Sequence, residues 1–318
     1  MNLRFRAAIL GIALIVSSAA NAADKIHVGK AIDDNWVYVP VDIAAEKGFY
    51  AKYGLDVEIS QLSGGAKLQQ ALLAGSIDLG FGGAQAMALS VKGSPTIAVA
   101  SFAGEPYNFS IVVAQDSPIK TIADLKGKGI GFATNGSLPD WLSQRFAIAQ
   151  GWGKDGMKRV TTGGAQASNA AVQSHQLDSM MTTTELGLFL ESKKQGRIIV
   201  GMQDYAKHLV TQAIFAHTPF VEAHPELVDR YLKAYFATIA WIKSHKDETS
   251  EIAARILHMD KAVMERTYDE ELFMLPDDGS FDPAGVEMLR DSFVELGILD
   301  KKPTEDQILT KRFLPVKP

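Results

Sequence analysis

The 318-residue chain contains no cysteine. It therefore has no disulfide framework, no thiolate nucleophile and no ligands for a cysteine-bound zinc ion or iron–sulfur cluster. It also has no block of lysine and arginine, and its formal net charge is -5, so it offers nucleic acid no basic surface. A hydrophobic content of 47% and a charged content of 22% indicate a globular protein of two domains or one large one.

Sequence motifs of catalysis and metal binding are missing as well. The seven histidines form no H-E-x-x-H motif and no close cluster with carboxylates, so we expect no metal site. Gly127, Gly129 and Gly131 do not complete the dinucleotide-binding pattern G-x-G-x-x-G, because Phe132 takes the last position and the run precedes a strand. No G-x-S-x-G nucleophile motif is present either. We therefore expect no cofactor and no enzymatic activity.

The main uncharged apolar run lies at the start of the chain. Residues 7–16 follow Arg4 and Arg6 and precede a small-residue stretch ending at Ala22. This layout predicts a signal peptide over 1–22, cleaved after Ala22. The alternative is a membrane anchor, but the run is shorter than the roughly 20 residues that a spanning helix needs. Because no cysteine is available for lipid attachment, we expect a free protein in a Gram-negative periplasm.

The rest of the chain alternates between strand-like and helix-like stretches. Short runs of apolar and alternating residues predict strands over 25–32, 55–60, 77–83, 96–102, 109–115, 128–134, 158–162, 177–183, 197–201 and 211–217. Most are separated by helix-like stretches of about ten residues, which indicates βαβ units and a mostly parallel sheet. Beyond residue 218 the pattern is mostly that of amphipathic helices.

One supersecondary unit occurs twice. SGGAKLQQALLAGSID (63–78) and TGGAQASNAAVQSHQLD (162–178) each begin with a hydroxyl residue and two glycines, continue into a helix rich in Ala and Gln, and end in an aliphatic-Asp pair. The pattern predicts two lobes built alike, although chance similarity between generic βαβ units is the alternative. A helix N-terminus carries unpaired N–H groups, and glycine lets a ligand approach them. Two such loops facing each other would hold a small anion or polar ligand without arginine.

Four stretches resemble periplasmic solute-binding proteins of the nitrate/sulfonate/taurine type, at 38–58, 64–81, 119–137 and 224–228. The resemblance implies an α/β, two-lobe type II periplasmic binding fold. Each lobe would be a mostly parallel sheet flanked by helices, with a helical C-terminal tail on the first lobe. It implies a first lobe over 23–109, a second over 110–216, and a return to the first over 217–318, with crossings near 108–111 and 211–218. It also implies a monomer that captures a small-molecule solute and delivers it to an ABC permease with its ATPase.

The resemblance also implies which loops line the cleft between the lobes. The candidate ligand-binding residues lie after the first strand, at helix starts and at strand ends: Asp34, Asn35, Trp36, Gly64, Gly65, Ala66, Gly83, Ala84, Gln85, Asn135, Gly136, Ser137, Gly164, Ala165, Gln166, Thr184 and Glu185. The Thr184-Glu185-Leu186 stretch keeps the acid of a Thr/Trp-Glu-Pro sequence frequent in the family but lacks its proline.

Three of these residues have a structural alternative that bears on the ligand. Trp36 forms an aromatic wall or packs in the core, and Asp34 and Glu185 contact ligand or cap helices. If both acids line the cleft they would repel a pure anion, which favours a zwitterion such as taurine or an amino-bearing heterocycle. We expect a small organic sulfonate, amino-sulfonate or related organic acid. Nitrate, a pyrimidine precursor and an aromatic acid stay open as ligands, and an enzyme or a ligand sensor as other functions.

Overall fold

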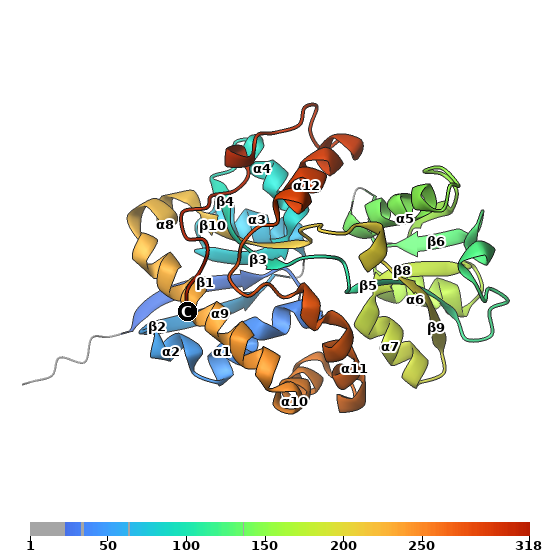
Figure 1. Cartoon of the computed structure of the whole chain (residues 1–318), viewed down its shortest axis with the longest axis horizontal. Helices are drawn as coiled ribbons and strands as arrows, with labels where there is room; N and C mark the ends of the chain where they lie inside the picture. The colour runs from blue at the N-terminus through green and yellow to red at the C-terminus, as the bar shows by residue number, and fades with distance from the viewer. Residues whose placement is uncertain (1–22, 33–34, 63, 136) are drawn as a thin grey trace, which may run out of the picture.

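The computed structural model describes residues 23–32, 35–62, 64–135 and 137–318. They form two five-stranded sheets that lie side by side, each covered by helices (Figure 1). The first sheet has the order β2-β1-β3-β10-β4, with β1 Asp24–Lys30, β2 Leu55–Gln61, β3 Leu79–Gly83, β4 Thr96–Ala103 and β10 Gln212–His217. The second has the order β7-β6-β8-β5-β9, with β5 Phe109–Ala114, β6 Gly129–Phe132, β7 Lys158–Thr161, β8 Ser179–Thr183 and β9 Gly196–Gly201.

The two sheets share one topology, as the repeated unit predicts. In each, the three strands at one edge are parallel, and the fourth strand, β10 or β5, runs antiparallel to both of its neighbours. The predicted fold class, two lobes with mostly parallel sheets, is confirmed. The antiparallel strand was not predicted, because its direction depends on the lobe from which the chain arrives.

The two copies of the repeated unit are equivalent down to single hydrogen bonds. Helix α3 (Gly65–Leu73) and helix α6 (Ala165–Gln173) follow β2 and β7 at the same edge of each sheet. Asp78 accepts a hydrogen bond from the backbone N–H of His27 in β1 at 2.8 Å, and Asp178 accepts one from Gly129 in β6 at 2.7 Å. Each aspartate thus ties the end of its helix-strand connection to the neighbouring parallel strand.

The remaining helices cover both sheets. Those of the first lobe are η1 Trp36–Tyr38, α1 Val39–Glu46, α2 Phe49–Lys52, η2 Ala84–Met87 and α4 Ala88–Val91. Those of the second are η3 Ile122–Leu125, α5 Leu138–Ala149, α7 Thr184–Ser192 and η4 Gln203–Tyr205. The C-terminal part contributes α8 Thr218–Ala223, α9 Pro225–Ser244, α10 Lys246–Leu257, α11 Lys261–Glu271, η5 Leu272–Met274, α12 Pro283–Glu295 and η6 Glu305–Gln307.

The chain passes between the sheets twice, over 104–108 and over 202–211. The first passage lies next to the predicted boundary between 109 and 110. The second lies earlier than predicted: β10 pairs with β3 and β4, so the chain has returned to the first sheet by Gln212 and not at 217. The sequence of β10 reads as a strand, but nothing in it indicates which sheet the strand joins.

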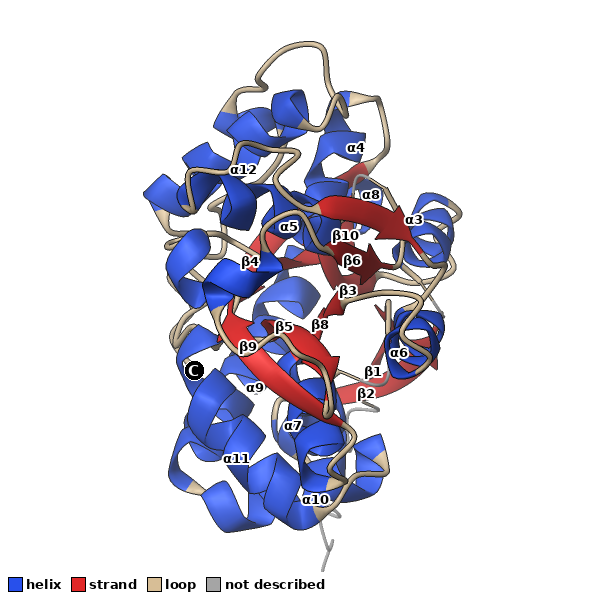
Figure 2. Cartoon of the chain, turned by 90° about the vertical axis from the view of Figure 1, so that its right-hand side faces the viewer, coloured by secondary structure: helices blue, strands red, loops and turns tan. Residues whose placement is uncertain are grey.

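The C-terminal helices pack mainly on the first lobe. Helix α9 contacts α1 and α2, where the rings of Tyr231 and Tyr50 stack at 5.2 Å. Phe81 of β3 lies between Phe102 and Tyr235, with ring centroids 4.9 and 5.1 Å away. Helix α11 also contacts α7 of the second lobe, as the view turned by 90° shows (Figure 2). The C-terminal part therefore links the lobes as well as completing the first core.

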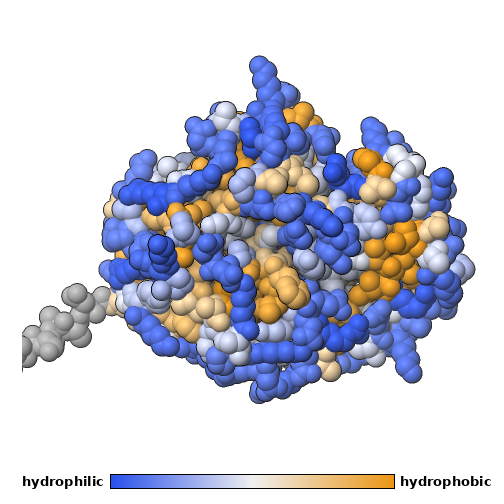
Figure 3. Space-filling view, viewed as in Figure 1, coloured by the Kyte–Doolittle hydropathy of each residue, from blue (hydrophilic) through white to orange (hydrophobic). Residues whose placement is uncertain are grey.

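The face of the molecule shown in Figure 3 is mostly hydrophilic, with hydrophobic residues gathered on the second lobe and near the centre. Within the described ranges, no helix combines the length and the apolar character needed to cross a membrane. The predicted signal peptide, residues 1–22, lies outside the described residues.

Candidate functional site

Two adjoining cavities lie between the lobes, and both are lined by residues of both sheets. The first, of about 310 Å³, lies mainly against the first lobe, and we call it the first-lobe compartment. The second, of about 400 Å³, lies mainly against the second lobe, and we call it the second-lobe compartment. Ile32, Phe109 and Gln212 line both. The two compartments therefore form one cleft with a shared middle section.

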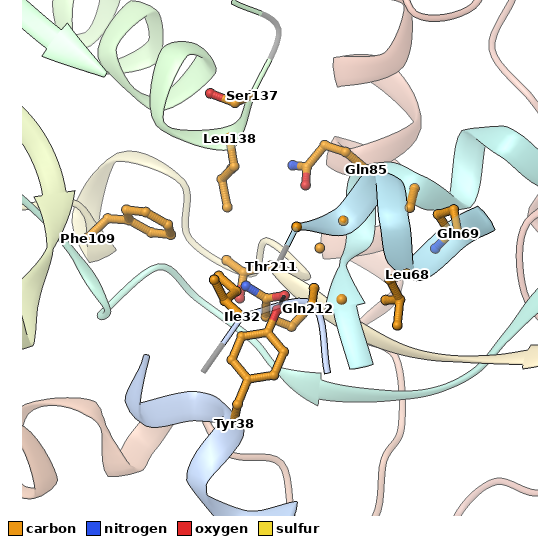
Figure 4. A pocket seen from close by; sticks show the side chains of 16 residues that line it. Ile32, Tyr38, Leu68, Gln69, Gln85, Phe109, Ser137, Leu138, Thr211 and Gln212 are labelled. Atoms are coloured by element: carbon orange, nitrogen blue, oxygen red, sulfur yellow. Dashed lines mark hydrogen bonds between the residues drawn. The ribbon is translucent and has the colours of Figure 1, made fainter. Parts of the chain in front are cut away.

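The first-lobe compartment contains the N-terminus of α3 and several amide side chains. Gly64 and Gly65 line it at the helix start, with Gln69 one turn further along α3. Gln85 points toward the cavity from η2, opposite Leu138 of the second lobe (Figure 4). The side chain of Gln212 accepts a hydrogen bond from the buried hydroxyl of Tyr38 at 3.0 Å.

Glycine is needed where α3 begins. Gly64 has a φ of +130°, a conformation that side-chain-bearing residues rarely adopt, and its N–H donates to the carbonyl of Ala31 at 2.6 Å. The second lobe repeats the attachment, since the N–H of Gly163 donates to the carbonyl of Ala133 at 3.0 Å. Each helix N-terminus is thus held against the end of a central strand, at the sheet edge where ligands bind in α/β folds.

The second-lobe compartment combines the N-terminus of α6 with hydroxyl and apolar side chains. Ala165 lines it at the helix start, followed by Ser168, whose hydroxyl is 2.6 Å from that of Thr162. Thr182 of β8 also lines it, and its buried hydroxyl has no hydrogen-bond partner among the described residues. The apolar lining comes from side chains of several elements: Phe109, Pro139, Met181, Leu186 and Met259.

Neither compartment has an Asp, Glu, Lys, Arg or His among its described lining residues. The polar groups that line the two compartments are backbone N–H groups, side-chain amides and hydroxyls. The chain described here also brings together no group of three side chains of the metal-binding types His, Asp and Glu. The cleft is therefore a surface for hydrogen bonding and apolar contact, with the partial positive charge of two helix N-termini.

The structure places part of the predicted site in this cleft. Seven of the predicted residues line it: Asn35, Gly64, Gly65, Gly83, Gln85, Ser137 and Ala165. Those that do not line it are Trp36, Ala66, Ala84, Asn135, Gly164, Gln166, Thr184 and Glu185. Asp34 and Gly136 lie outside the described residues. Contact of any of these residues with a ligand stays a prediction.

Trp36 packs in the core and forms no aromatic wall of the cleft. Its side chain is 1% exposed and meets the ring of Tyr268 edge-on at 6.4 Å. The side chain of Asn35 accepts a hydrogen bond from the N–H of Val37 at 3.1 Å and so begins the short helix η1. This turn directs Trp36 toward the C-terminal helices, which no local sequence signal indicates.

Glu185 lines neither compartment and lies beside a second acid. It is fully buried, accepts a hydrogen bond from the N–H of Trp36 at 3.2 Å, and lies beside the buried carboxyl group of Glu271 at the end of α11. Burial raises the pKa of Glu185 to about 7. Burial and then the charge of Glu185 raise the pKa of Glu271 well above its usual value. The raised pKa values of the two neighbouring carboxyl groups favour a proton held between them, which would link the two lobes.

Thr184 lines a different cavity. Its hydroxyl is 2.7 Å from that of Ser110 and donates to the carbonyl of Tyr107 at 2.8 Å. This cavity of about 330 Å³, which we call the hinge-side cavity, also contains Asp269 and Phe273. Thr184 thus fixes the first passage between the lobes and lines the hinge-side cavity instead of the cleft.

Sequence reasoning missed several lining residues: Tyr38, Leu68, Gln69, Phe109, Leu138, Met181, Thr211 and Gln212. One of them carries a signal that could have been used. Gln69 lies between Leu68 and Leu72 on the buried side of α3, where an apolar residue is expected. The others lie on passages or strands whose partners depend on the assembled lobes.

A family model described as NMT1/THI5 like matches residues 35–249. A protein of Brucella abortus (strain 2308), provisionally named a binding protein, is 28% identical over 304 residues, or 91% of this chain and 92% of its own. A provisionally named aliphatic sulfonates-binding protein of Bacillus subtilis (strain 168) is 27% identical over 242 residues, or 71% of this chain and 69% of its own. Among solved structures, the periplasmic aliphatic sulphonate binding protein SsuA from Escherichia coli superposes with a TM-score of 0.76 at 19% identity, covering 90% and 92% of the two chains.

Proposed function

Since the chain belongs to the NMT1/THI5-like family and has the fold of periplasmic binding proteins, we propose that it is the substrate-binding component of an ABC importer. One observation carries the proposal: the two lobes, built alike, enclose a cleft lined by both, with a helix N-terminus from each. A ligand that contacts both lobes would stabilise their closed arrangement, which is how hinge-closing receptors bind. The two passages between the sheets, 104–108 and 202–211, are the hinge.

The proposed ligand is a small organic acid with an apolar body, and foremost a sulfonate. The N-terminus of α6, with Thr182 and Ser168 nearby, suits an acidic head group. Phe109, Leu138 and Met181 suit an organic body. A zwitterion is favoured less than the sequence suggests, because Glu185 lies outside the cleft and cannot repel an anion there. The names of the B. subtilis relative and of SsuA agree with this ligand class.

The proposed place of action is the periplasm, reached by means of the signal peptide predicted over 1–22. We propose that the protein works there as a monomer and hands its ligand to a permease with its ATPase. The ligand leaves the cleft chemically unchanged, because no base–nucleophile pair lines it in the described part of the chain. Mass spectrometry of a ligand recovered after incubation should therefore return the mass that was added.

A thermal-shift panel tests the proposed ligand class. We expect benzenesulfonate and short alkanesulfonates to raise the melting temperature, because a ligand present at a hundred times its Kd stabilises the folded state by about 2.7 kcal/mol. Nitrate should give no shift, because it has no apolar body to contact the largely apolar wall of the second-lobe compartment. Taurine, benzoate and an aminopyrimidine complete the panel. The proposal would be contradicted if nitrate alone raised the melting temperature, or if none of the compounds did.

A further inference from the structure

Gln69 is a buried amide without hydrogen-bond partners. Its side chain is 7% exposed, and neither its Oε1 nor its Nε2 has a partner among the described residues. Leaving a buried polar atom unpaired costs about 1–3 kcal/mol. A leucine of similar volume would avoid this cost on the apolar side of α3, so the amide points to a group that arrives with the ligand.

Gln85 carries another buried polar atom without a hydrogen-bond partner in the same cavity. Its Nε2 is buried and has no partner among the residues described, and its side chain points into the first-lobe compartment (Figure 4). Gln212, in the middle of the cleft, differs because its amide oxygen already accepts from Tyr38. The unsatisfied amides therefore gather at one end of the cleft, beyond the shared middle section.

We propose that Gln69 and Gln85 bind a second polar group of the ligand, a neutral one that both donates and accepts hydrogen bonds, such as a carboxamide. This inference rests on the proposed function, in which the acidic head occupies the second-lobe compartment. The ligand then extends past Phe109 and Gln212, which line both compartments, and ends at the two glutamines.

The composition of the first-lobe compartment explains why the second group is neutral. No acidic or basic side chain is found among its described lining residues, so a second charge would be buried without a counter-ion. Gln69 offers one acceptor and one set of donors, and Gln85 adds a further donor. A carboxamide can donate to the acceptor oxygen of Gln69 and accept from the NH₂ groups of both glutamines, whereas an alkyl or phenyl end can do neither.

Calorimetric titration of the full chain with two matched probes tests the inference. Benzenesulfonate and 4-carbamoylbenzenesulfonate share the acidic head and ring and differ only in the amide. We expect the protein to bind the carbamoyl compound at least tenfold more tightly. Gln69→Leu should abolish the difference, and Gln85→Leu should reduce it. Gln70→Leu is the matched control, since Gln70 is exposed on the same helix and lines neither compartment; it should keep the full preference.

The melting temperature of the ligand-free variants gives an independent readout. Gln69→Leu should raise it by a few degrees because it removes two unpaired buried atoms, and Gln70→Leu should leave it unchanged. Equal binding of both probes, or a preference that survives Gln69→Leu, would overturn the inference while the proposed function stands. If neither probe binds, the proposed ligand class fails and the inference falls with it.

Discussion

Replacing Glu271 with glutamine should stabilise the protein at pH 8 by about 1–3 kcal/mol, the usual cost of a buried polar group without a partner, and change little near pH 4.5. Glu271 and Glu185 are fully buried, come from different lobes, and lie beside each other with raised pKa values. Their arrangement needs a proton between them. Glutamine supplies an N–H donor to Glu185 at every pH, so the variant no longer depends on that proton.

The direction of the pH dependence follows from the raised pKa values. Burial raises the pKa of Glu185 to about 7, and that of Glu271 lies well above its usual value, with Glu270 as a further negative neighbour. Between about pH 4.5 and 7 the folded protein therefore binds more protons than the unfolded chain. Stability from this pair is present in acid and declines as the pH rises through this range.

Thermal unfolding from pH 4.5 to pH 8 measures the effect. The melting temperature of Glu271→Gln should be higher than that of the unmodified protein, and the difference should grow as the pH rises. Glu270→Gln changes the exposed neighbour on the same helix and should keep most of the original slope. If the melting temperature of Glu271→Gln changed with pH in the same way as that of the unmodified protein, the two carboxyl groups would not hold a proton between them.

Placing an acid at the start of α6 should weaken binding of an organic sulfonate at least a hundredfold. Ala165 lines the second-lobe compartment at the first position of the helix. In Ala165→Asp the new carboxylate occupies the helix N-terminus and repels the acidic head. Two like charges 4 Å apart near a protein surface repel by about 4 kcal/mol, whereas a hundredfold loss requires only about 2.7 kcal/mol.

Gln166→Asp provides the control for this substitution. It puts the same charge in the same helical turn, where the helix dipole stabilises an acidic side chain in the same way. Gln166, however, does not line the cleft. Titration with benzenesulfonate should give near-normal affinity for Gln166→Asp and very weak binding for Ala165→Asp. Similar affinities for the two variants would place the acidic head elsewhere.

The sequence predicts most of the secondary structure because its local signals are strong. Gly64 and Gly163 mark two helix starts, and Asp78 and Asp178 mark the strands that follow, in both sheets alike. The repeat thereby predicts the two-lobe fold. The direction of β5 and the sheet that β10 joins depend on contacts between segments about a hundred residues apart, which no local pattern encodes.

The candidate site could be predicted only in part for the same reason. Helix starts such as Gly65 and Ala165 lie at the predicted sheet edges and line the cleft. Trp36 and Glu185 look equally suitable in the sequence, but the C-terminal helices, with Tyr268 and Glu271, cover them. Their burial is a tertiary effect.

The two lobes are proposed to hold the ligand between them. A crystal structure of the protein grown with benzenesulfonate tests this most directly. We predict the sulfonate at the N-terminus of α6, beside Ala165 and Thr182, with the ring against Phe109 so that both lobes contact the ligand. A sulfonate found in the hinge-side cavity near Phe273, or on the outer surface with the cleft empty, would contradict the account.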